Sequence, residues 1–280
     1  MIEIKNLVKK YGNHVAVDDI SFTLEPGKIY GFLGPNGAGK STTMNMITGY
    51  IGNTSGSIVI NGYDILSEPE EAKACIGYLP ELPPLYMDMT VKEYLQFVAE
   101  LKGIAKDKRE EAIVSVAQMT KLEDVIERMI KNLSKGYKQR VGLAQAIIGF
   151  PEIIILDEPT VGLDPAQIIE IRELIKELGK EHTVILSSHI LSEIQAVCDY
   201  VFIISKGKLV ASDTTENLLQ NMSNKDENAE LVIKGSLEEV QKLMKKMERE
   251  TEMKFEMELR TSTKSLEDVF MELTQEGGEK

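Results

Sequence analysis

Hydrophobic residues along this chain gather in short runs that predict β-strands, with amphipathic helical stretches between most of the later runs. Several runs are apolar on both faces, including residues 29–33 (IYGFL) and 153–156 (IIIL), which is typical of parallel strands covered by helices. The first run, MIEIKNLV, alternates between apolar and polar residues and precedes the turn residues YGNH, which predicts an antiparallel layer beside the parallel core. We therefore expect an α/β fold.

The strand pattern stops between about residues 85 and 150, where three helical stretches predict an inserted helical subdomain. Beyond a polar linker near residue 216, the pattern becomes strand, helix, strand, helix. We therefore expect two domains, residues 1–215 and a small α+β extension at residues 216–280. The extension suits dimerisation or regulation, but a solvated packing appendage is the favoured interpretation.

The composition argues against several classes of protein. An apolar content of 42% over 280 residues is enough for a large buried core. A net charge of -13 disfavours a general nucleic-acid binder, because phosphate backbones need Lys and Arg surfaces. The apolar runs are too short to span a bilayer and the first residues lack the order of a signal peptide, so we expect a cytosolic chain. Cys75 and Cys198 are expected to be reduced core thiols.

A glycine-rich loop, GPNGAGKST at residues 34–42, follows the apolar run IYGFL. Glycine adopts positive φ and lets backbone N–H groups turn around an anion, so the loop suits phosphate. Lys40 can reach terminal phosphates and Ser41 can ligate Mg²⁺, while a helix predicted from Lys40 onward presents its positive end to the same place. The spacing of these residues predicts a P-loop.

A second acidic element stands at the end of a buried run, in IIILDE at residues 153–158. Asp157 is placed to hold Mg²⁺ through water, and Glu158 to lie beside a water in line with a γ-phosphate. Adjacent carboxylates leaving a buried strand are costly unless a metal or hydrogen-bond donors compensate them. The alternative is a strand end followed by ordinary surface acids. We expect Glu158 to be the general base, which implies hydrolysis rather than binding alone.

A third element, LSKGY at residues 133–137, begins a predicted helix with Ser134 as its cap, and Gly136 leaves that end open to a phosphate. The order of P-loop, serine-glycine helix start and acidic strand resembles the ATP-binding cassette (ABC) ATPases over residues 1–215. In addition, PTVGLDP resembles the family's D-loop, with Asp164 as its acid, and VILSSH resembles the strand that ends in the switch histidine, His189. Asp164 followed by Pro165 also makes a good start for a helix.

The resemblance implies a P-loop NTPase (RecA-like) fold with a mainly parallel sheet core, an antiparallel β layer, a helical insert and a C-terminal extension. It implies ATP and Mg²⁺ as cofactors, Glu158 and His189 as catalytic residues, and contacts from His189 to the γ-phosphate. The implied ATP-binding residues are Tyr11, Gly34, Pro35, Asn36, Gly37, Ala38, Gly39, Lys40, Ser41 and Thr42. The signature residues implied to contact the ATP of a partner subunit are Ser134, Lys135, Gly136 and Tyr137. The implied metal ligands are Ser41, Glu81 and Asp157.

Two of these assignments stay open. Tyr11 would stack on adenine in the family, but it is equally compatible with a turn residue packed against the core. Glu81 stands where the family usually has glutamine, and its charge is expected to tighten metal coordination or to favour its own protonated form. The signature also departs from the common LSGGQ, because Lys135 and Tyr137 replace a glycine and the glutamine. Together with SLEDVFMELT near the C-terminus, these departures resemble the ABC-2 exporter branch.

The leading expectation is therefore an ATP-hydrolysing subunit that energises a separate membrane permease, an exporter by this resemblance, from the inner face of the membrane. Two ATP molecules would be enclosed in a homodimer, or in a heterodimer with a related ATPase. The loop after Glu81, LPPLYMDMTV, is the expected docking region for the permease, although its apolar residues Leu85, Tyr86 and Met87 are equally compatible with the core. A soluble ABC ATPase acting on ribosomes or DNA is disfavoured by the single cassette and the acidic charge. A nucleotide sensor without turnover is disfavoured by the intact catalytic motifs.

Overall fold

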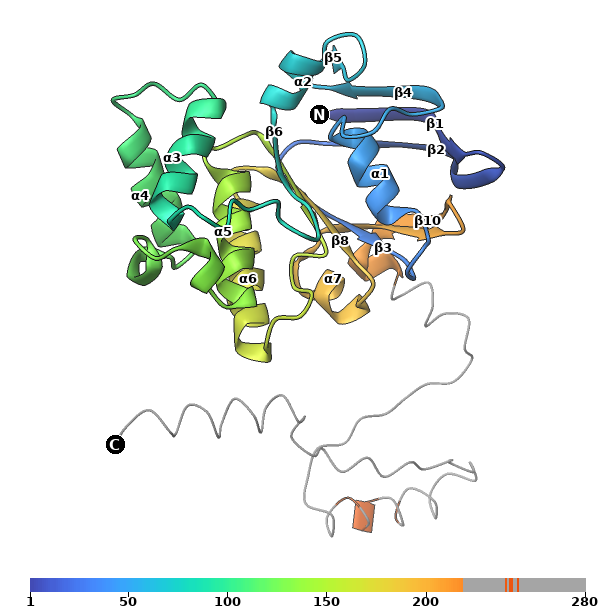
Figure 1. Cartoon of the computed structure of the whole chain (residues 1–280). Helices are drawn as coiled ribbons and strands as arrows, with labels where there is room; N and C mark the ends of the chain where they lie inside the picture. Colours follow the sequence, from blue (N-terminus) through green and yellow to red (C-terminus); the bar gives the residue numbers. More distant parts are fainter. Residues whose placement is uncertain (219–239, 241, 244–245, 247–280) are drawn as a thin grey trace. The chain divides into compact units, whose positions relative to one another are not determined.

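A computed structural model describes residues 1–218, 240, 242–243 and 246 of the chain. The chain divides into two units, Met1–Leu218 and Leu219–Lys280. The strands predicted for the C-terminal extension and most residues of its predicted helices lie outside the described residues, and the domain boundary at 215/216 stays a prediction. All the elements named below belong to the first unit (Figure 1).

A six-stranded, mainly parallel sheet forms the centre of this unit, in the order β10-β9-β3-β8-β7-β6 (Figure 1). Its strands are β3 (Ile29–Leu33), β6 (Ile76–Leu79), β7 (Ile153–Asp157), β8 (Thr183–Ser188), β9 (Tyr200–Ser205) and β10 (Lys208–Thr214). Only the β9–β10 pair is antiparallel in the described part of this sheet. Every residue of β7 and β8 is buried, which confirms the prediction of parallel strands covered on both faces.

A second sheet is antiparallel and has the order β2-β1-β4-β5. Its strands are β1 (Ile2–Tyr11), β2 (His14–Leu24), β4 (Ser55–Ile60) and β5 (Tyr63–Asp64). Its apolar face packs with helix α1 (Lys40–Ile47) and one face of the parallel sheet in a single core. Within that core the ring of Phe32 stacks on that of Phe202, with centroids 5.1 Å apart. The predicted antiparallel layer is confirmed.

The other face of the parallel sheet packs against helices, which form the second core. These helices are α3 (Val91–Leu101), α4 (Arg109–Met119), α5 (Lys135–Ile147), α6 (Pro165–Leu178) and α7 (Leu191–Val197). The first three confirm the helical stretches predicted between residues 85 and 150, and two short 3-10 helices, Glu123–Val125 and Ile130–Asn132, connect α4 to α5. A further helix, α2 (Pro69–Ala74), precedes β6. No helix among the described residues is long and apolar enough to cross a bilayer.

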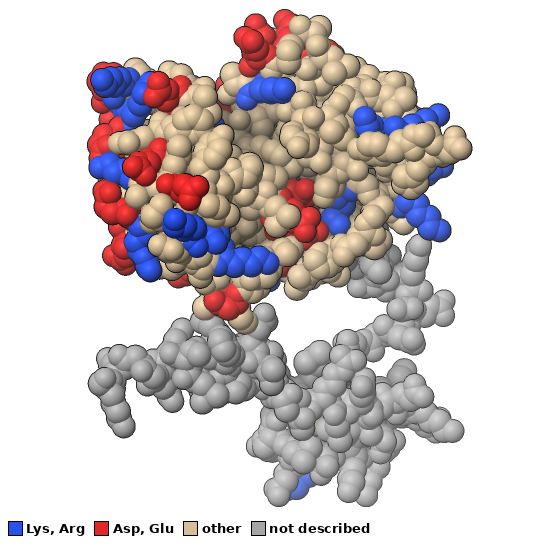
Figure 2. Space-filling view, viewed as in Figure 1, with Lys and Arg blue, Asp and Glu red and all other residues tan. Residues whose placement is uncertain are grey.

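The surface over α3 and α4 carries acidic and basic side chains side by side (Figure 2). Lys92 Nζ lies 3.1 Å from Glu110 Oε1, and Arg109 Nη1 lies 2.9 Å from Glu100 Oε2. On the face shown, the described residues form no large basic patch. Both cysteines are free, as predicted, with Cys198 buried and Cys75 half-buried.

The sequence analysis missed strands β5, β6 and β10. Strand β6 escaped because it has only four residues and a central glycine, Gly77, which weakens its apolar pattern. The structure explains this glycine, since a Cβ built on Gly77 would lie 2.0 Å from the carbonyl oxygen of Ala146 in α5. Helix α5 therefore approaches the backbone of β6 more closely than any side chain would permit.

Gly77→Ala is predicted to lower the free energy of unfolding by about 1–3 kcal/mol, because α5 must move away from β6. Urea unfolding followed by circular dichroism measures this loss. Gly52→Ala is the matched control, since a Cβ at Gly52 meets nothing within 4 Å. Equal unfolding midpoints for the two variants would contradict the packing argument.

Candidate active site

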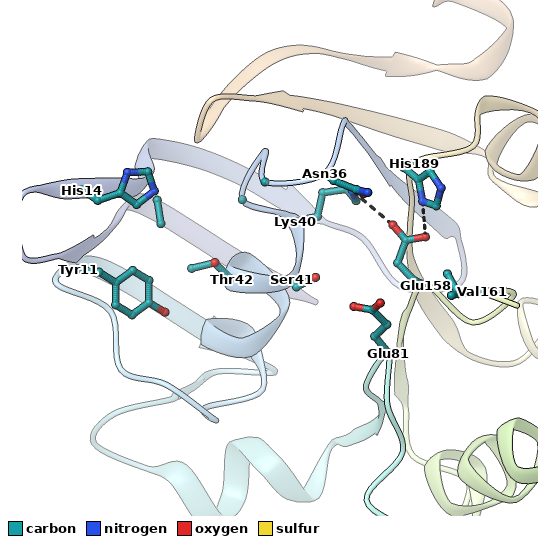
Figure 3. Close-up of a pocket in the computed structure, with 13 residues that line it drawn as sticks. Tyr11, His14, Asn36, Lys40, Ser41, Thr42, Glu81, Glu158, Val161 and His189 are labelled. Carbon is teal, nitrogen blue, oxygen red and sulfur yellow. Dashed lines mark hydrogen bonds and ion pairs between the residues drawn. The ribbon is translucent and has the colours of Figure 1, made fainter. Parts of the chain in front are cut away.

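A cavity of about 510 Å³ opens beside the loop that connects β3 to α1 (Figure 3). It is lined by Tyr11, His14, Ala16, Asn36, Gly37, Gly39, Lys40, Ser41, Thr42, Glu81, Glu158, Val161 and His189. Most of the residues predicted to bind ATP or to catalyse its hydrolysis therefore line one cavity, and the lining residues come from five separate segments of the chain. Among the predicted P-loop residues, Gly34, Pro35 and Ala38 do not line it.

The glycine-rich loop has the backbone that the sequence predicted. Gly37 and Gly39 have φ values of 78° and 106°, in the region that favours glycine. A Cβ on Gly39 would also lie 2.7 Å from the carbonyl oxygen of Ala16 in β2, so the loop can lie against that strand only with glycine there. Helix α1 begins at Lys40, as predicted, and three residues of its first turn, Lys40, Ser41 and Thr42, line the cavity. The first N–H groups of a helix have no partner within the helix, so this end suits an anion.

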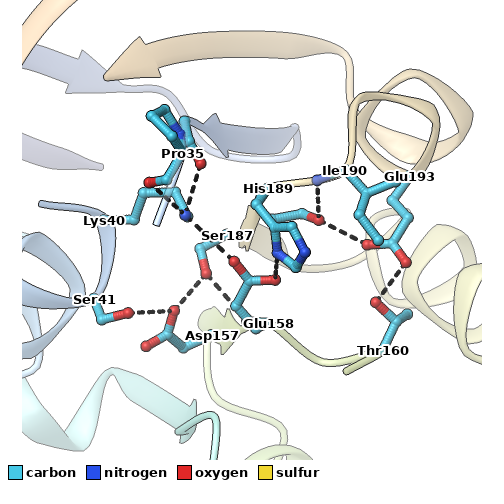
Figure 4. Close-up of polar contacts among 12 residues, drawn as sticks. Pro35, Lys40, Ser41, Asp157, Glu158, Thr160, Ser187, His189, Ile190 and Glu193 are labelled. Atoms are coloured by element: carbon cyan, nitrogen blue, oxygen red, sulfur yellow. Dashed lines mark hydrogen bonds and ion pairs between the residues drawn. The ribbon is translucent and has the colours of Figure 1, made fainter. Parts of the chain in front are cut away.

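Lys40 is buried, with only 5% of its surface exposed. Its Nζ donates to the carbonyl oxygens of Gly34 at 2.8 Å and Pro35 at 3.4 Å, and lies 3.4 Å from Glu158 Oε1 (Figure 4). Its three N–H donors thus face three oxygen acceptors. This ammonium group links the loop to the end of β7.

Glu158 follows β7 directly and has a φ of 48°, which is uncommon for a residue with a Cβ and costs of order 1–3 kcal/mol. Its backbone N–H holds this conformation by donating to Ser187 Oγ at 3.0 Å and to the Ser187 carbonyl at 3.2 Å. Its side chain turns into the cavity, where Oε2 lies 2.9 Å from Nδ1 of His189 (Figure 4). The Glu158 carboxylate therefore lies between Lys40 and His189.

Asp157 is the last residue of β7 and is 3% exposed. Burial raises the pKa of its carboxyl, while hydrogen bonds donated by the hydroxyls of Ser187 and Ser41 oppose that shift. The Ser41 hydroxyl lies 3.2 Å from Asp157 Oδ1. One carboxylate and one hydroxyl are hard oxygen ligands and fit Mg²⁺, which usually keeps waters and binds substrate phosphates as its other ligands. No group of three or more His, Cys, Asp and Glu that could hold a metal occurs among the described residues.

Glu81 and Tyr11 lie at different parts of the cavity (Figure 3). Glu81 is exposed on the loop that follows β6 and adds a carboxyl group to the cavity wall, and its role as a metal ligand stays a prediction. Tyr11 is 50% exposed, and Lys9 Nζ lies 5.1 Å from its ring centroid. This exposure argues against Tyr11 as a residue packed in the core, and its stacking on adenine stays a prediction.

The signature segment lies at the start of α5. Ser134 caps that helix as predicted, since its side chain accepts from the N–H of Tyr137 at 3.3 Å. Lys135 lies against the loop after Glu158, where a Cβ on Gly162 would stand 1.9 Å from the lysine Nζ. Asp164 and Pro165 begin α6 as predicted, with Asp164 Oδ1 accepting from the Gln167 N–H at 2.9 Å. Neither Asp164 nor any signature residue lines the cavity of its own chain.

Sequence reasoning missed several residues of the site. His14, Ala16 and Val161 line the cavity, although the sequence assigned none of them to it. Val161 lies within the D-loop run PTVGLDP and His14 within the turn YGNH, but neither run indicated that these side chains reach the cavity. Ser187 lies within the run VILSSH, yet its role depends on the parallel pairing of Asp157 with Ser187 in adjacent strands. That pairing is not visible in the sequence.

Ser187→Ala is predicted to raise the pKa of Asp157 further, because the variant removes a donor to the charged carboxylate. A protonated carboxyl does not bind Mg²⁺, so the acidic limb of the ATP hydrolysis profile should move to higher pH. At neutral pH the Mg²⁺ concentration for half-maximal hydrolysis should rise about tenfold. Ser192→Ala, at an exposed position in α7, is the control. An unchanged metal titration would contradict this role for Ser187.

Comparison with known proteins agrees with this geometry. A family model described as ABC transporter matches residues 17–161. A bacitracin transport ATP-binding protein of Bacillus licheniformis is 43% identical over 212 residues, covering 75% of this chain and 68% of that protein. A lantibiotic transport ATP-binding protein of Streptococcus pyogenes is 38% identical over 228 residues, covering 80% of this chain and 96% of that protein.

Among solved structures, one described as the ATP-binding subunit of an ABC transporter has a TM-score of 0.74 and 30% sequence identity. It covers 88% of this chain, and this chain covers 99% of it. The family and the fold class predicted from the motifs are thereby confirmed. On the family match and the relatives' identity and coverage, the chain belongs to the ABC transporter family, whose ATP-binding subunits hydrolyse ATP with Mg²⁺.

Proposed function

We propose that this chain binds and hydrolyses ATP in the cavity beside α1 and drives a separate membrane permease by closing as a dimer. The contacts of the Glu158 carboxylate are the observation that carries the proposal. Its Oε1 lies 3.4 Å from Lys40 Nζ, and its Oε2 lies 2.9 Å from His189 Nδ1. A phosphate-binding lysine, a carboxylate base and a histidine thus converge in one cavity. Such convergence is what in-line attack on a phosphoryl group requires.

In this proposal the Glu158 carboxylate accepts a proton from the attacking water, whose oxygen bonds to the γ-phosphorus while the bond to the bridging oxygen breaks. Lys40 and the loop amides hold the phosphates, and His189 is oriented by its contact with Glu158. Ser41 and Asp157 would hold Mg²⁺, with Glu81 nearby, and the ion would neutralise phosphate charge. Tyr11 would contact the adenine from the other end of the cavity.

The arrangement supports a dimer because the signature residues Ser134–Tyr137 lie outside their own chain's cavity. We propose that they contact ATP held by a second copy, or by a related ATPase. The loss of γ-phosphate contacts after hydrolysis would then reopen the dimer.

The loop after Glu81 is the proposed docking site for the permease. Leu82 is 80% exposed, and Tyr86 and Met87 are also exposed, whereas Leu85 packs against the helical core. The packing of Leu85 supports the core interpretation for that side chain, and the exposure of Leu82, Tyr86 and Met87 supports docking. The relatives named for bacitracin and lantibiotic transport support an exporter, and the chain would lie in the cytoplasm against the membrane through its permease.

Glu158→Gln is predicted to reduce steady-state ATP turnover at least about 100-fold, because an amide cannot accept the proton of the attacking water. The variant should retain ATP binding and accumulate as a dimer, which light scattering in the presence of Mg²⁺ and ATP measures. Glu181→Gln, at an exposed position before β8, should hydrolyse at the parent rate. Parent turnover in Glu158→Gln would overturn the assignment of the base.

Glu81→Gln is predicted to change the Mg²⁺ dependence of hydrolysis more than the affinity for ATP, because it removes a negative charge from the cavity wall without shortening the side chain. Hydrolysis titrated with Mg²⁺ at fixed ATP measures the first quantity, and equilibrium binding of ATP in EDTA measures the second. Identical metal titrations for the parent and the variant would refute a role of Glu81 at the metal.

A further inference from the structure

A buried carboxyl group lies behind the cavity and takes no part in the proposed chemistry. Glu193, in α7, is only 4% exposed and does not line the cavity. Its Oε1 accepts from the Thr160 hydroxyl at 2.7 Å, and its Oε2 accepts from the Ser188 hydroxyl at 2.7 Å (Figure 4). Thr160 and Ser188 are themselves buried, so one side chain holds two hydroxyl groups away from water.

The two hydroxyl groups belong to the segments that carry the proposed base and histidine. Thr160 lies two residues after Glu158, and Ser188 immediately precedes His189. Since Glu158 and His189 also contact each other at 2.9 Å, the five residues close a ring. Covalent backbone forms two sides of this ring, and hydrogen bonds form the others.

Ser188 is fixed from a second direction as well. Its Oγ accepts from the backbone N–H of Ile190 at 3.0 Å, at the point where α7 begins. The side chain of Glu193, in the first turn of α7, therefore ties the start of its own helix to the end of β8 and to the loop after β7. Movement of either segment would break a hydrogen bond in a buried place, where the lost partner is not replaced by water.

We propose that Glu193 is a positioning residue that sets the geometry of the Glu158–His189 pair. This inference rests on the proposed function, because it concerns the same reaction. A buried carboxyl is costly unless hydrogen bonds compensate it, and both bonds of Glu193 hold segments that end in the cavity. Misplacement of a catalytic group by about 1 Å costs up to about 100-fold in rate, so the two bonds matter for turnover more than for ATP binding.

The test compares steady-state hydrolysis by Glu193→Ala and Glu193→Gln with that of the parent. Glu193→Ala removes both acceptors and should lower kcat at least about tenfold, while the KM for ATP stays within about threefold. Glu193→Gln keeps the shape, accepts from one hydroxyl and donates to the other, and should restore kcat to within about threefold of the parent. Gln195→Ala, at an exposed position in the same helix, is the matched control.

Thr160→Val and Ser188→Ala remove the partners instead of the carboxyl and keep the test decisive if Glu193→Ala does not fold. Each should lower kcat with little change in KM. In the double variant Thr160→Val/Glu193→Ala, kcat should fall by less than the product of the two single fold-losses, because both changes break the same hydrogen bond.

Three results would overturn the inference. The first is a kcat within twofold of the parent for folded Glu193→Ala, or for both partner variants. The second is a rise in KM that matches the fall in kcat. The third is a kcat of Glu193→Gln that stays as low as that of Glu193→Ala. Glu158→Gln, measured in parallel, distinguishes a failure of the positioning role from a failure of the proposed function. If Glu158→Gln hydrolyses ATP at the parent rate, the proposed function fails; if it is inactive while the Glu193 variants are normal, only the positioning role fails.

Discussion

The site depends on the meeting of one ammonium group and one carboxylate at the carboxyl edge of the parallel sheet. Lys40 Nζ and Glu158 Oε1 lie 3.4 Å apart, and both side chains are buried. The strands that precede these two residues, β3 and β7, are not neighbours, because β8 lies between them in the sheet. A buried ion pair is costly to desolvate unless further hydrogen bonds satisfy it, and here the Gly34 carbonyl and His189 supply them.

Buried strands hold the carboxylates in place, and the strained backbone lies at Glu158, the residue that follows β7. Strands β7 and β8 are buried along their whole length between two hydrophobic cores, so the positions of their ends are closely determined. Glu158 then turns into the cavity through a left-handed backbone, which Ser187 stabilises with two acceptors. Ser187, at the end of β8, thus contacts the carboxylate of Asp157 and the backbone N–H of Glu158. The next residue, Ser188, is held by Glu193, which we propose to position the Glu158–His189 pair.

The chain presents two functional surfaces that do not meet within it. One is the cavity beside α1, and the other is the signature segment at the start of α5, whose Lys135 lies against Gly162 of the loop after Glu158. Under the proposed function, a partner subunit brings the second surface to the first. The contact between Lys135 and Gly162 places the signature beside the same loop that Thr160 anchors, so both surfaces share one flanking segment.

Elements with local signals were predictable from the amino-acid sequence. The helix start at Lys40, the Ser134 cap and the Asp164–Pro165 helix start were all predictable, because a cap and its helix lie within four residues of each other. Ser187 reaches Glu158, and Glu193 reaches Thr160, only in the folded chain, since the residues of each pair are about 30 positions apart along the sequence. Strand order and register bring such residues together, and the sequence pattern records neither of them.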